Sequence, residues 1–381
     1  MLIPNELQIL LGLLVAFYSF ALLGLVVGMR RLNYDLSTAK PLVSVIVAAR
    51  NEERNVGPLL ERLTHQDYEA YEVIIVNDRS SDQTASIVER FQSEHSKVQR
   101  IDINSVVTDM PAKKNALARG IASSKGEILC FTDADCLPPS GWISSLVAAF
   151  DERTGLVAGY SPYSVQPARV GKTSPLAHLL FNFVEYEEFK GALWAAGAIG
   201  MRKAWLCTGR SLAYRRAVYE EVGGFERIKQ SISGDDDLFL QLVRRETSWH
   251  IRYITSVKSF VPTTPPSDFG QFIQQRVRHF SAGRHFPISM KIFFLTFHAA
   301  SLLVLLSFVG SIIFDRTEVL VWPYLCKCIV DCMVFFTAAP VFGLRKFASS
   351  FLLMEVLYIL YNVLIGPLGF IKHFEWKPEK N

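Results

Sequence analysis

The chain has 381 residues, of which 50% are hydrophobic and 20% are charged, and its mean hydropathy is +0.22. This composition is too apolar for an ordinary soluble protein, yet it is too charged for a protein made of membrane helices alone, so we expect a polar domain joined to membrane segments. The formal net charge is +4 and no long run of lysine and arginine occurs, which argues against a nucleic-acid partner.

Residues 7–28 form an uninterrupted apolar run, long enough to cross the hydrocarbon core of a bilayer, which takes about 20 helical residues. Arg30, Arg31 and Lys40 follow this run, and no basic residue precedes it. A cleaved signal peptide would instead carry its positive charge in front of the apolar stretch. We therefore expect residues 1–32 to be a transmembrane anchor whose basic flank stays in the cytosol.

Residues 41–285 are expected to form a cytosolic domain of the α/β class. Short apolar runs alternate with amphipathic stretches, and the predicted strands are residues 43–48, 72–77, 98–103 and 127–132. Strands and helices that alternate in this way form βαβ units, which give a parallel sheet with helices on its faces.

Polar residues follow three of these strands. Arg50 and Glu52 come after the first strand, Asp78 after the second, and Asp133 and Asp135 after the fourth. The carboxyl ends of parallel strands meet at the edge where open α/β sheets bind ligands. Two carboxylates separated by one residue suit Mg²⁺ or Mn²⁺, which would bridge a diphosphate. Alone, such a pair is more often a turn or a helix cap, so its position at a strand end carries the prediction.

Asp78 is a candidate for binding a nucleobase, because Ser80 and Ser81 can cap the helix that follows and leave its carboxylate free. Lys113 and Lys114 stand at the start of another predicted helix. Cations and free backbone amides there favour a phosphate, and a solvated basic face is the alternative.

Three consecutive carboxylates, Asp235, Asp236 and Asp237, precede a further helical run. They could stabilise the helix dipole, or one of them could be the general base that removes a proton from an acceptor hydroxyl. Residues 275–279, with the sequence QRVRH, come last before the second membrane region. Their donors suit phosphate or leaving-group charge, and interfacial anchoring by the arginines is the alternative.

Residues 174–200 are aromatic-rich but carry four charged side chains, which makes this stretch too polar to span. It either lies along the membrane surface or is a core helix of the domain. The six cysteines show no paired CxxC spacing, and we interpret them as reduced thiols that fill apolar space.

Residues 286–372 are expected to be a C-terminal membrane region of two to three helices, with apolar segments at 289–314, about 319–342 and about 350–371. The middle segment is the weakest candidate. Lys327 and Asp331 lie one helical turn apart within it and could pair on one face, and a re-entrant or interfacial helix is the alternative. If all three segments cross, the basic tail conflicts with the positive-inside rule, which suggests that one segment does not fully span.

With these motifs in this order, residues 41–285 resemble family 2 glycosyltransferases of the GT-A fold. VSVIVAARNEE resembles the family's opening strand and nucleotide loop, NDRSSDQT its base-binding segment, Lys113-Lys114 its GK segment, TDAD its metal motif, and QRVRH its QRxRW motif. The resemblance implies that a set of polar residues binds the donor: Arg50, Glu52, Asp78, Lys113, Lys114, Asp133, Gln275, Arg276 and Arg278.

Three segments depart from the family pattern or concern the acceptor. Aligning the Asp-Leu pair after the TED motif places Asp235 on the catalytic base and Gly234 where Glu is usual, with Asp236 as a close competitor. His279 replaces the Trp that often lines the acceptor entrance. The segment GRSLAYRRAVYEEVGGFE resembles the acceptor side, and the acceptor-side residues implied are Gly209, Arg210, Gly224, Phe225 and His279.

The resemblance implies an inverting, metal-dependent transfer from a nucleotide sugar, with a UDP-linked donor expected, in a multi-pass protein of the cell membrane. The membrane layout is similar to that of enzymes that glycosylate ceramide, polyprenyl phosphate or carotenoids, so we expect a hydroxylated lipid acceptor at the cytosolic face. The alternatives are a processive polysaccharide synthase and an inactive, nucleotide-binding membrane protein.

Overall fold

The computed structural model describes residues 5–105, 109–164, 175–314 and 317–371. Its strands are β1 (Val43–Ala49), β2 (Tyr71–Asp78), β3 (Val98–Ile103), β4 (Ile128–Phe131), β5 (Thr154–Gly159), β6 (Leu212–Arg215) and β7 (His250–Ile254). Its helices are α1 (Asn5–Arg30), α2 (Val56–Thr64), α3 (Thr84–Glu94), α4 (Ala112–Ser123), α5 (Trp142–Ala148), α6 (Pro175–Gly200), α7 (Arg216–Glu221), α8 (Asp237–Glu246), α9 (Phe269–Ser281), α10 (Ile288–Ile313), α11 (Thr317–Ala338), α12 (Phe351–Leu364) and α13 (Leu368–Ile371).

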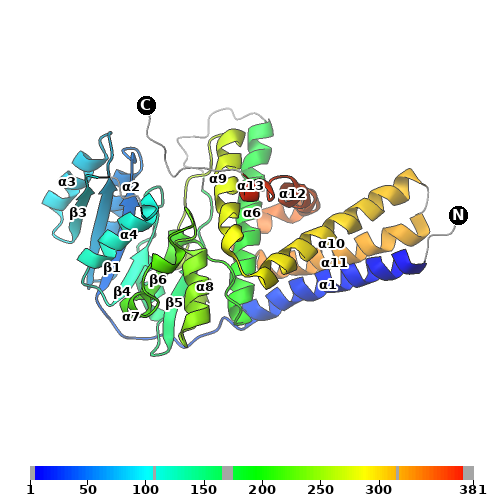
Figure 1. Ribbon diagram of the computed structural model, residues 1–381, viewed down its shortest axis with the longest axis horizontal. Helices are drawn as coiled ribbons and strands as arrows, with labels where there is room; N and C mark the ends of the chain where they lie inside the picture. The colour runs from blue at the N-terminus through cyan, green and yellow to red at the C-terminus, as the bar shows by residue number, and fades with distance from the viewer. Residues whose placement is uncertain (1–4, 106–108, 165–174, 315–316, 372–381) are drawn as a thin grey trace.

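The elements are arranged along one long axis. The sheet and its helices occupy one end, and the long apolar helices α1, α10 and α11 occupy the other (Figure 1). Between them stand α6 and α9, which run crosswise to that axis (Figure 1). Any site at the edge of the sheet that faces α6 and α9 therefore lies close to the apolar helices.

The sheet is mixed, with the strand order β3-β2-β1-β4-β6-β5-β7. The four strands predicted from the sequence are present within one residue at each end and pair in parallel, so the carboxyl ends of β1, β2 and β4 meet at one edge. The expectation of a purely parallel sheet is wrong, because β6 pairs antiparallel with both β4 and β5. The chain beyond β4 leaves the repeating βαβ pattern on which that expectation rested.

Alternate residues of the buried strands face two separate cores. Val45 packs with residues of α2, α3 and α5, whereas its neighbour Ile46 packs on the other side of the sheet with α4. The second core continues through α6 into α1, α10, α11 and α12 without a break. The sheet domain and the apolar helices therefore share one hydrophobic core.

Helix α6 meets α1 through glycines. A Cβ atom added to Gly28 would lie 2.0 Å from the carbonyl oxygen of Gly197, and one added to Gly200 would lie 2.0 Å from the carbonyl oxygen of Gly28. Only glycine allows two helix backbones to approach so closely. This contact fixes the crosswise helix against the first apolar helix.

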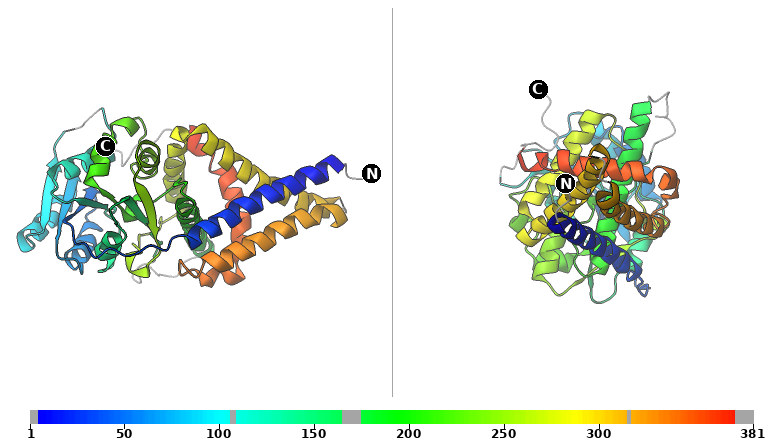
Figure 2. Two further views of the ribbon diagram at one scale, coloured as in Figure 1. Left: turned by 90° about the horizontal axis from the view of Figure 1, so that it is seen from below. Right: turned by 90° about the vertical axis from the view of Figure 1, so that its right-hand side faces the viewer.

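Four helical segments are long and apolar enough to cross a membrane in the described part of the chain, including Phe351–Ile371. These four segments differ in their direction relative to the long axis of the molecule. Helices α1, α10 and α11 run along the long axis, whereas α12 lies across it in both views (Figures 1 and 2). The middle segment, which seemed the weakest candidate, runs with the other long helices, and the last segment is the one that does not.

Buried ion pairs join these helices. Lys327 Nζ lies 2.5 Å from Asp331 Oδ2, as the spacing predicted, and the Tyr18 hydroxyl donates a hydrogen bond to Asp331 Oδ1 at 2.6 Å. Lys190 of α6 pairs with Glu355 of α12 at 2.6 Å. Each pair satisfies charges that would otherwise be costly among apolar helices. All six cysteines are free thiols, in agreement with the prediction.

Candidate active site

Asp78 lies at the carboxyl end of β2 and is held by two arginines. Its side chain is 2% exposed, Arg79 Nε donates a hydrogen bond to its Oδ1 at 2.8 Å, and Arg50 Nη1 lies 4.0 Å from its Oδ2. Arg79 turns back onto its neighbour because its φ of +54° lies in the left-handed region. This second arginine was not predicted, since no pattern in the sequence marks such a turn.

The loops after β1 and β2 bind each other beside Asp78. Ser80 Oγ accepts a hydrogen bond from Asn51 N–H at 3.0 Å, and Thr84 Oγ1 accepts one from Glu52 N–H at 2.7 Å. The N–H of Ser81 donates to Asn51 Oδ1 at 2.8 Å. The prediction that the two serines cap α3 is therefore wrong, because they tie the loops together and α3 begins later, at Thr84.

Lys113, in the first turn of α4, joins two carboxylates from distant segments. Its Nζ lies 3.0 Å from Asp133 Oδ1, after β4, and 3.0 Å from Asp235 Oδ2, before α8. Burial disfavours the charged amine, but the carboxylates outweigh it and raise the pKa of Lys113. Burial alone would raise the pKa of Asp133, yet Lys113, Arg210 and Arg278 hold it below its ordinary value. Both groups are therefore charged.

Lys114 has a different position from its neighbour. Its ammonium is fully buried and donates hydrogen bonds to the carbonyl oxygen of Ser233, at 2.8 Å, and to that of Ser231. Burial, aided by the charge of Lys113, lowers the pKa of Lys114 to about 8. These contacts contradict the predicted donor contact of Lys114, and the residue instead holds the segment that leads into Asp235.

Asp235 and Asp236 differ in what their carboxylates do. Asp236 caps α8: its Oδ1 accepts from Asp237 N–H at 2.7 Å and its Oδ2 from Gly209 N–H at 2.8 Å. Burial and the neighbouring Asp235 raise the pKa of Asp236. Lys113 is the partner of the Asp235 carboxylate within the described residues. The geometry therefore favours Asp235 over Asp236 as the group that is available to a ligand.

Gly234 stands where the family pattern has Glu, and its backbone requires glycine. Its φ is +86°, and a Cβ there would lie 2.6 Å from Leu238 Cδ1. A side chain at this position would collide with the first turn of α8. The departure from the TED pattern is therefore tied to a local turn that orients Asp235.

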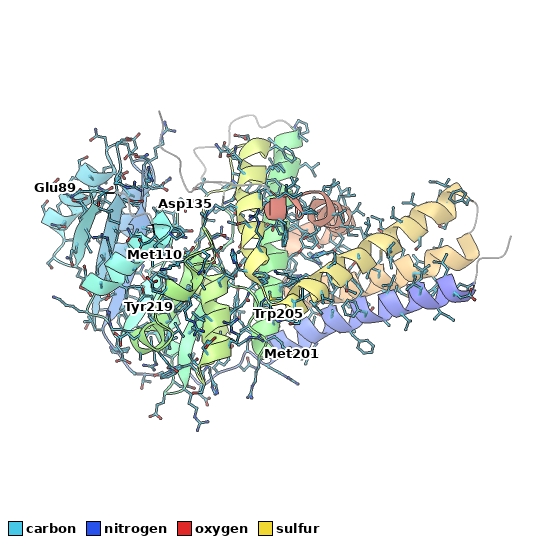
Figure 3. All side chains as sticks on the ribbon, viewed as in Figure 1. Glu89, Met110, Asp135, Met201, Trp205 and Tyr219 are labelled. Atoms are coloured by element: carbon cyan, nitrogen blue, oxygen red, sulfur yellow. The ribbon has the colours of Figure 1, made fainter. Side chains whose placement is uncertain are left out.

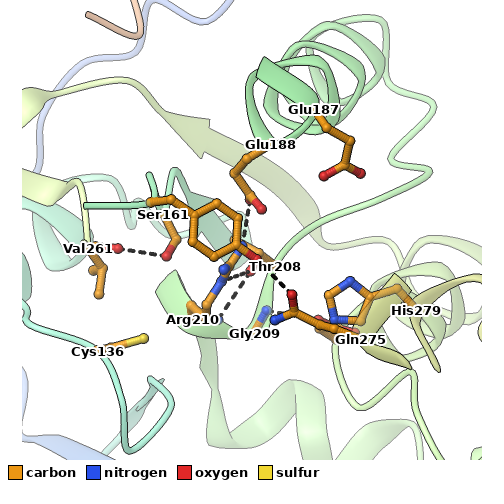
Figure 4. Close-up of polar contacts among 12 residues, drawn as sticks. Cys136, Ser161, Glu187, Glu188, Thr208, Gly209, Arg210, Val261, Gln275 and His279 are labelled. Atoms are coloured by element: carbon orange, nitrogen blue, oxygen red, sulfur yellow. Dashed lines mark hydrogen bonds and ion pairs between the residues drawn. The ribbon is translucent and has the colours of Figure 1, made fainter. Parts of the chain in front are cut away.

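Two glutamates of α6 reach into the site and bind its arginines. Glu188 Oε1 lies 2.6 Å from Arg210 Nη2, and Glu187 Oε2 lies 2.5 Å from Arg276 Nη2. The ring of Tyr163 lies between the two guanidinium groups, 5.1 Å and 5.7 Å from their central carbons. Figure 4 shows both glutamates on α6 facing this cluster. Neither glutamate was predicted as a site residue, and the only signal for them is their charge within an aromatic-rich helix.

His279 presents an N–H group to the site. Arg276 Nη1 lies 3.2 Å from His279 Nδ1. A guanidinium can only donate, so Nδ1 accepts and the ring proton is on Nε2. Burial and the charges of Arg278, Arg276 and Arg210 hold the pKa of His279 well below its ordinary value, so the ring is neutral. Gln275 lies beside it, with its Oε1 3.4 Å from the Tyr163 hydroxyl.

A cavity of about 760 Å³ connects these groups with the apolar helices. Its lining includes Lys113, Asp133, Asp135 and Asp235 at the sheet, and Phe294 of α10 among the apolar helices. Asp135 lies between the sheet domain and α9, on the side that faces the crosswise helices (Figure 3). This volume is in the range that holds a drug-sized ligand. Most of the predicted site residues line it: Asp133, Asp135, Gly209, Arg210, Asp235, Asp236, Gln275, Arg276, Arg278 and His279.

Gly224 and Phe225 are not among the lining residues of this cavity. Gly224 has a φ of +62° in the turn after α7, and Phe225 is 1% exposed and packs against Tyr219 and Phe239. Phe225 also lines a small cavity together with Lys113, Asp133 and Asp235, and the acceptor-side position of Gly224 and Phe225 stays a prediction.

The two metal candidates fit a cation that shares its ligands with a substrate. Asp133 and Asp135 both line the cavity, and the described residues contain no cluster of three or more His, Cys, Asp or Glu side chains that could hold a metal. Mg²⁺ and Mn²⁺ are commonly bound by one or two carboxylates, with phosphate oxygens and water as the other ligands. The donor set therefore suits a metal bound together with a diphosphate.

The sheet and the carboxylates at its ligand edge define the GT-A class of α/β folds. A mannosyltransferase from Pyrobaculum calidifontis, in complex with GDP-mannose and Mn²⁺, has a similar structure with a TM-score of 0.54 and 19% sequence identity, covering 95% of this chain and 98% of that chain. Residues 44–223 match the model of glycosyl transferase family 2. This segment, a little under half of the chain, is therefore similar to that family.

Curated relatives agree with this family. A probable glycosyltransferase, YdaM, from Bacillus subtilis is 30% identical over 225 residues, which covers 56% of this chain and 49% of that protein. A beta-monoglucosyldiacylglycerol synthase from Trichormus variabilis is 26% identical over 216 residues, which covers 56% of this chain and 43% of that protein. The chain thus spans about half the length of these relatives.

Proposed function

We propose that this chain is an inverting glycosyltransferase that moves a sugar from a nucleotide sugar to the hydroxyl group of a lipid at the cytosolic face of a membrane. One observation carries the proposal: a single cavity runs from the carboxylates Asp133, Asp135 and Asp235 to the aromatic side chains of α10 and α12. A water-soluble acceptor would not need a cavity lined by apolar helices.

The donor would bind at the sheet end of the cavity. Asp78 and Arg50, which pair with each other at 4.0 Å, would bind the base, and Asp133 and Asp135, which line the cavity, would hold Mg²⁺ or Mn²⁺. When bound, the cation would offset the charge of the diphosphate and of the leaving nucleotide. Arg278 lines the same cavity and, within the described residues, its guanidinium has no ion-pair partner, so it can stabilise the leaving group as well.

Asp235 would act as the general base. It accepts the proton of the lipid hydroxyl while the hydroxyl oxygen forms a bond to the anomeric carbon and the bond from that carbon to the diphosphate breaks. One displacement inverts the anomeric centre, and no covalent intermediate with the protein is needed. Lys113 holds the Asp235 carboxylate in place through the 3.0 Å ion pair, so the base is positioned before the acceptor arrives.

The acceptor would enter sideways from the bilayer. Leu295 of α10 is 72% exposed and Ile371 of α13 is 73% exposed, and both also line the cavity. Exposed apolar side chains at a cavity mouth suit a lipid environment. The hydrocarbon chains of the lipid can therefore stay among apolar groups while its hydroxyl reaches the site.

We place α1, α10 and α11 across the membrane and α12 along its cytosolic surface. Three crossings put Arg30 and Arg31 after α1, and Arg345 and Lys346 after α11, on the cytosolic side. Because α12 does not cross in this arrangement, Ile371 stays on that side too. The conflict with the positive-inside rule, which three C-terminal crossings would create, then disappears.

The proposal is tested with purified protein in lipid nanodiscs. Labelled UDP-glucose, UDP-galactose, UDP-N-acetylglucosamine and GDP-mannose are offered with Mn²⁺ or Mg²⁺ and a panel of hydroxylated lipids, and Asp235→Asn is the inactive control. We expect a product that is soluble in organic solvent and carries one sugar per lipid. Long, water-soluble products would instead show a processive polysaccharide synthase, and nucleotide binding without transfer of any sugar would show an inactive domain.

A further inference from the structure

The lipid end of the cavity contains polar groups that the proposed reaction does not use. His298 of α10 and Asn362 of α12 line the cavity among aromatic side chains. The rise of an α-helix places His298 about 15 Å along α10 from its first residue, Ile288. Both residues belong to apolar segments, where polar side chains are costly unless they have a partner.

Tyr358 of α12 lies next to both polar groups. The His298 ring centroid lies 6.3 Å from that of Tyr358 on α12, and Asn362 lies one helical turn after Tyr358. Phe294 and Phe297 flank the imidazole on its own helix, with centroids at 6.4 Å and 5.3 Å. The imidazole is therefore enclosed by rings on α10 and α12 and opens onto the cavity.

Within the described residues, their hydrogen-bonding capacity is not used up. The amide nitrogen of Asn362 donates to the carbonyl oxygen of Tyr358 at 2.8 Å, and its side chain also contacts the Tyr358 hydroxyl. In the part of the chain that the structure describes, neither ring nitrogen of His298 has a protein hydrogen-bond partner. A neutral imidazole offers one donor and one acceptor, and the Asn oxygen offers an acceptor. The pair therefore matches a group that can both donate and accept.

The cation beside these polar groups is paired. The nearby cation is Lys190, whose Nζ lies 5.2 Å from the centre of the Tyr358 ring, and it is paired with Glu355 at 2.6 Å. Among the described residues, the next cation in the lining is Lys291, two helical turns before His298 on α10, and its ammonium donates to the carbonyl oxygen of Arg284. A phosphate beside His298 would therefore bring a charge into an apolar region. The polar groups thus fit a neutral ligand.

We infer that His298 and Asn362 form a second polar subsite, which binds a neutral donor–acceptor group of the acceptor lipid, namely a secondary amide or a second hydroxyl group. This inference rests on the proposed lipid glycosyltransferase function and narrows its acceptor class. The reacting hydroxyl lies at Asp235 and the second polar group lies at the subsite, so a lipid with both is held at two points. A lipid with ester groups offers acceptors only and satisfies half of the subsite.

The test compares three lipids that differ in this group: a C16 ceramide, with an amide and a second hydroxyl; 1,2-dioleoylglycerol, with esters; and hexadecanol, with neither. Transfer of labelled sugar is measured in nanodiscs for wild type, His298→Leu and Asn362→Leu. Phe294→Leu is the matched control, because it lines the same cavity without a polar group. For ceramide we expect each polar variant to lose about tenfold in kcat/KM, the effect of one neutral hydrogen bond, while hexadecanol changes by less than twofold.

A second readout does not depend on transfer. Ceramide should raise the Tm of the detergent-solubilised wild type more than hexadecanol does, and His298→Leu should remove this difference. Equal use of ceramide and hexadecanol by wild type, or equal losses for all three lipids in His298→Leu, would overturn the subsite while leaving the proposed function intact. Absence of transfer to any lipid would count against the proposed function, and a preserved Tm difference would then show that the subsite still binds the lipid.

Discussion

Replacing Asp235 by Asn should abolish most sugar transfer without unfolding the protein. An asparagine has nearly the same shape but cannot take a proton from the acceptor hydroxyl. General base catalysis contributes about 10² to 10⁴ in rate, which corresponds to about 3 to 5.5 kcal/mol of transition-state stabilisation. Lys113 loses one of its two ion pairs but keeps the one to Asp133 at 3.0 Å, so the site remains assembled. We therefore expect kcat to fall by that factor while donor affinity changes little.

Asp236→Asn is the matched control for this variant. The Asp236 carboxylate accepts two backbone N–H groups, from Asp237 and Gly209, and an amide can accept only one of them well. The unsatisfied N–H should cost about 1–3 kcal/mol of stability, and kcat should fall less than in Asp235→Asn. Initial rates, donor binding by calorimetry and Tm are measured for both variants. If Asp235→Asn kept full activity and a folded Asp236→Asn were inactive, the assignment of the base would be wrong.

Three further outcomes follow from the structure. Asp133→Ala should weaken binding of the nucleotide sugar in the presence of Mn²⁺ and leave the weaker, metal-free binding nearly unchanged. Calorimetry with and without a chelator measures both affinities. If the metal dependence of binding were unchanged, Asp133 would not be a metal ligand. Lys327→Leu should destabilise the detergent-solubilised protein by about 3–5 kcal/mol because it leaves Asp331 buried without its partner, whereas the double replacement by Leu should cost much less; Tm measurements decide between them. His279 has a pKa below its ordinary value, so the folded protein binds fewer protons than the unfolded chain as the pH falls below about 6.5. Wild type should therefore lose stability in that range, and His279→Gln should lose less in a Tm series from pH 7 to pH 5.

The strands and the carboxylates were predictable because their signals are local. Apolar runs marked β1 to β4 to within one residue, and parallel pairing alone then brought Asp78 and Asp133 to one edge. Asp235 followed from its place before α8, although choosing it over Asp236 required the backbone hydrogen bonds that occupy the latter.

Other features depend on contacts that no local pattern contains. Glu187 and Glu188 bind Arg276 and Arg210, which are far away in the sequence, so their charge alone did not place them in the site. Adjacent residues on a helix point about 100° apart, so Lys113 and its neighbour face different surroundings, and the sequence alone does not show which one faces the crevice. A hydropathy profile reports the length and apolarity of a segment but not its direction in the fold. It therefore could not show that α12 lies across the other helices.

The crosswise position of α6 and α9 fixes the distance between the proposed active site and the long apolar helices. These helices separate the sheet from the long apolar helices, and α6 is fixed at α1 by the contact between Gly28 and Gly197 (Figure 1). In the proposed arrangement, a thicker or thinner bilayer changes how α1, α10 and α11 are immersed but not the distance from the reacting carboxylate to the membrane surface. Under the proposed function, the hydroxyl group of a lipid acceptor must reach that fixed level, so lipids whose hydroxyl lies deep among the acyl chains should react slowly in any membrane.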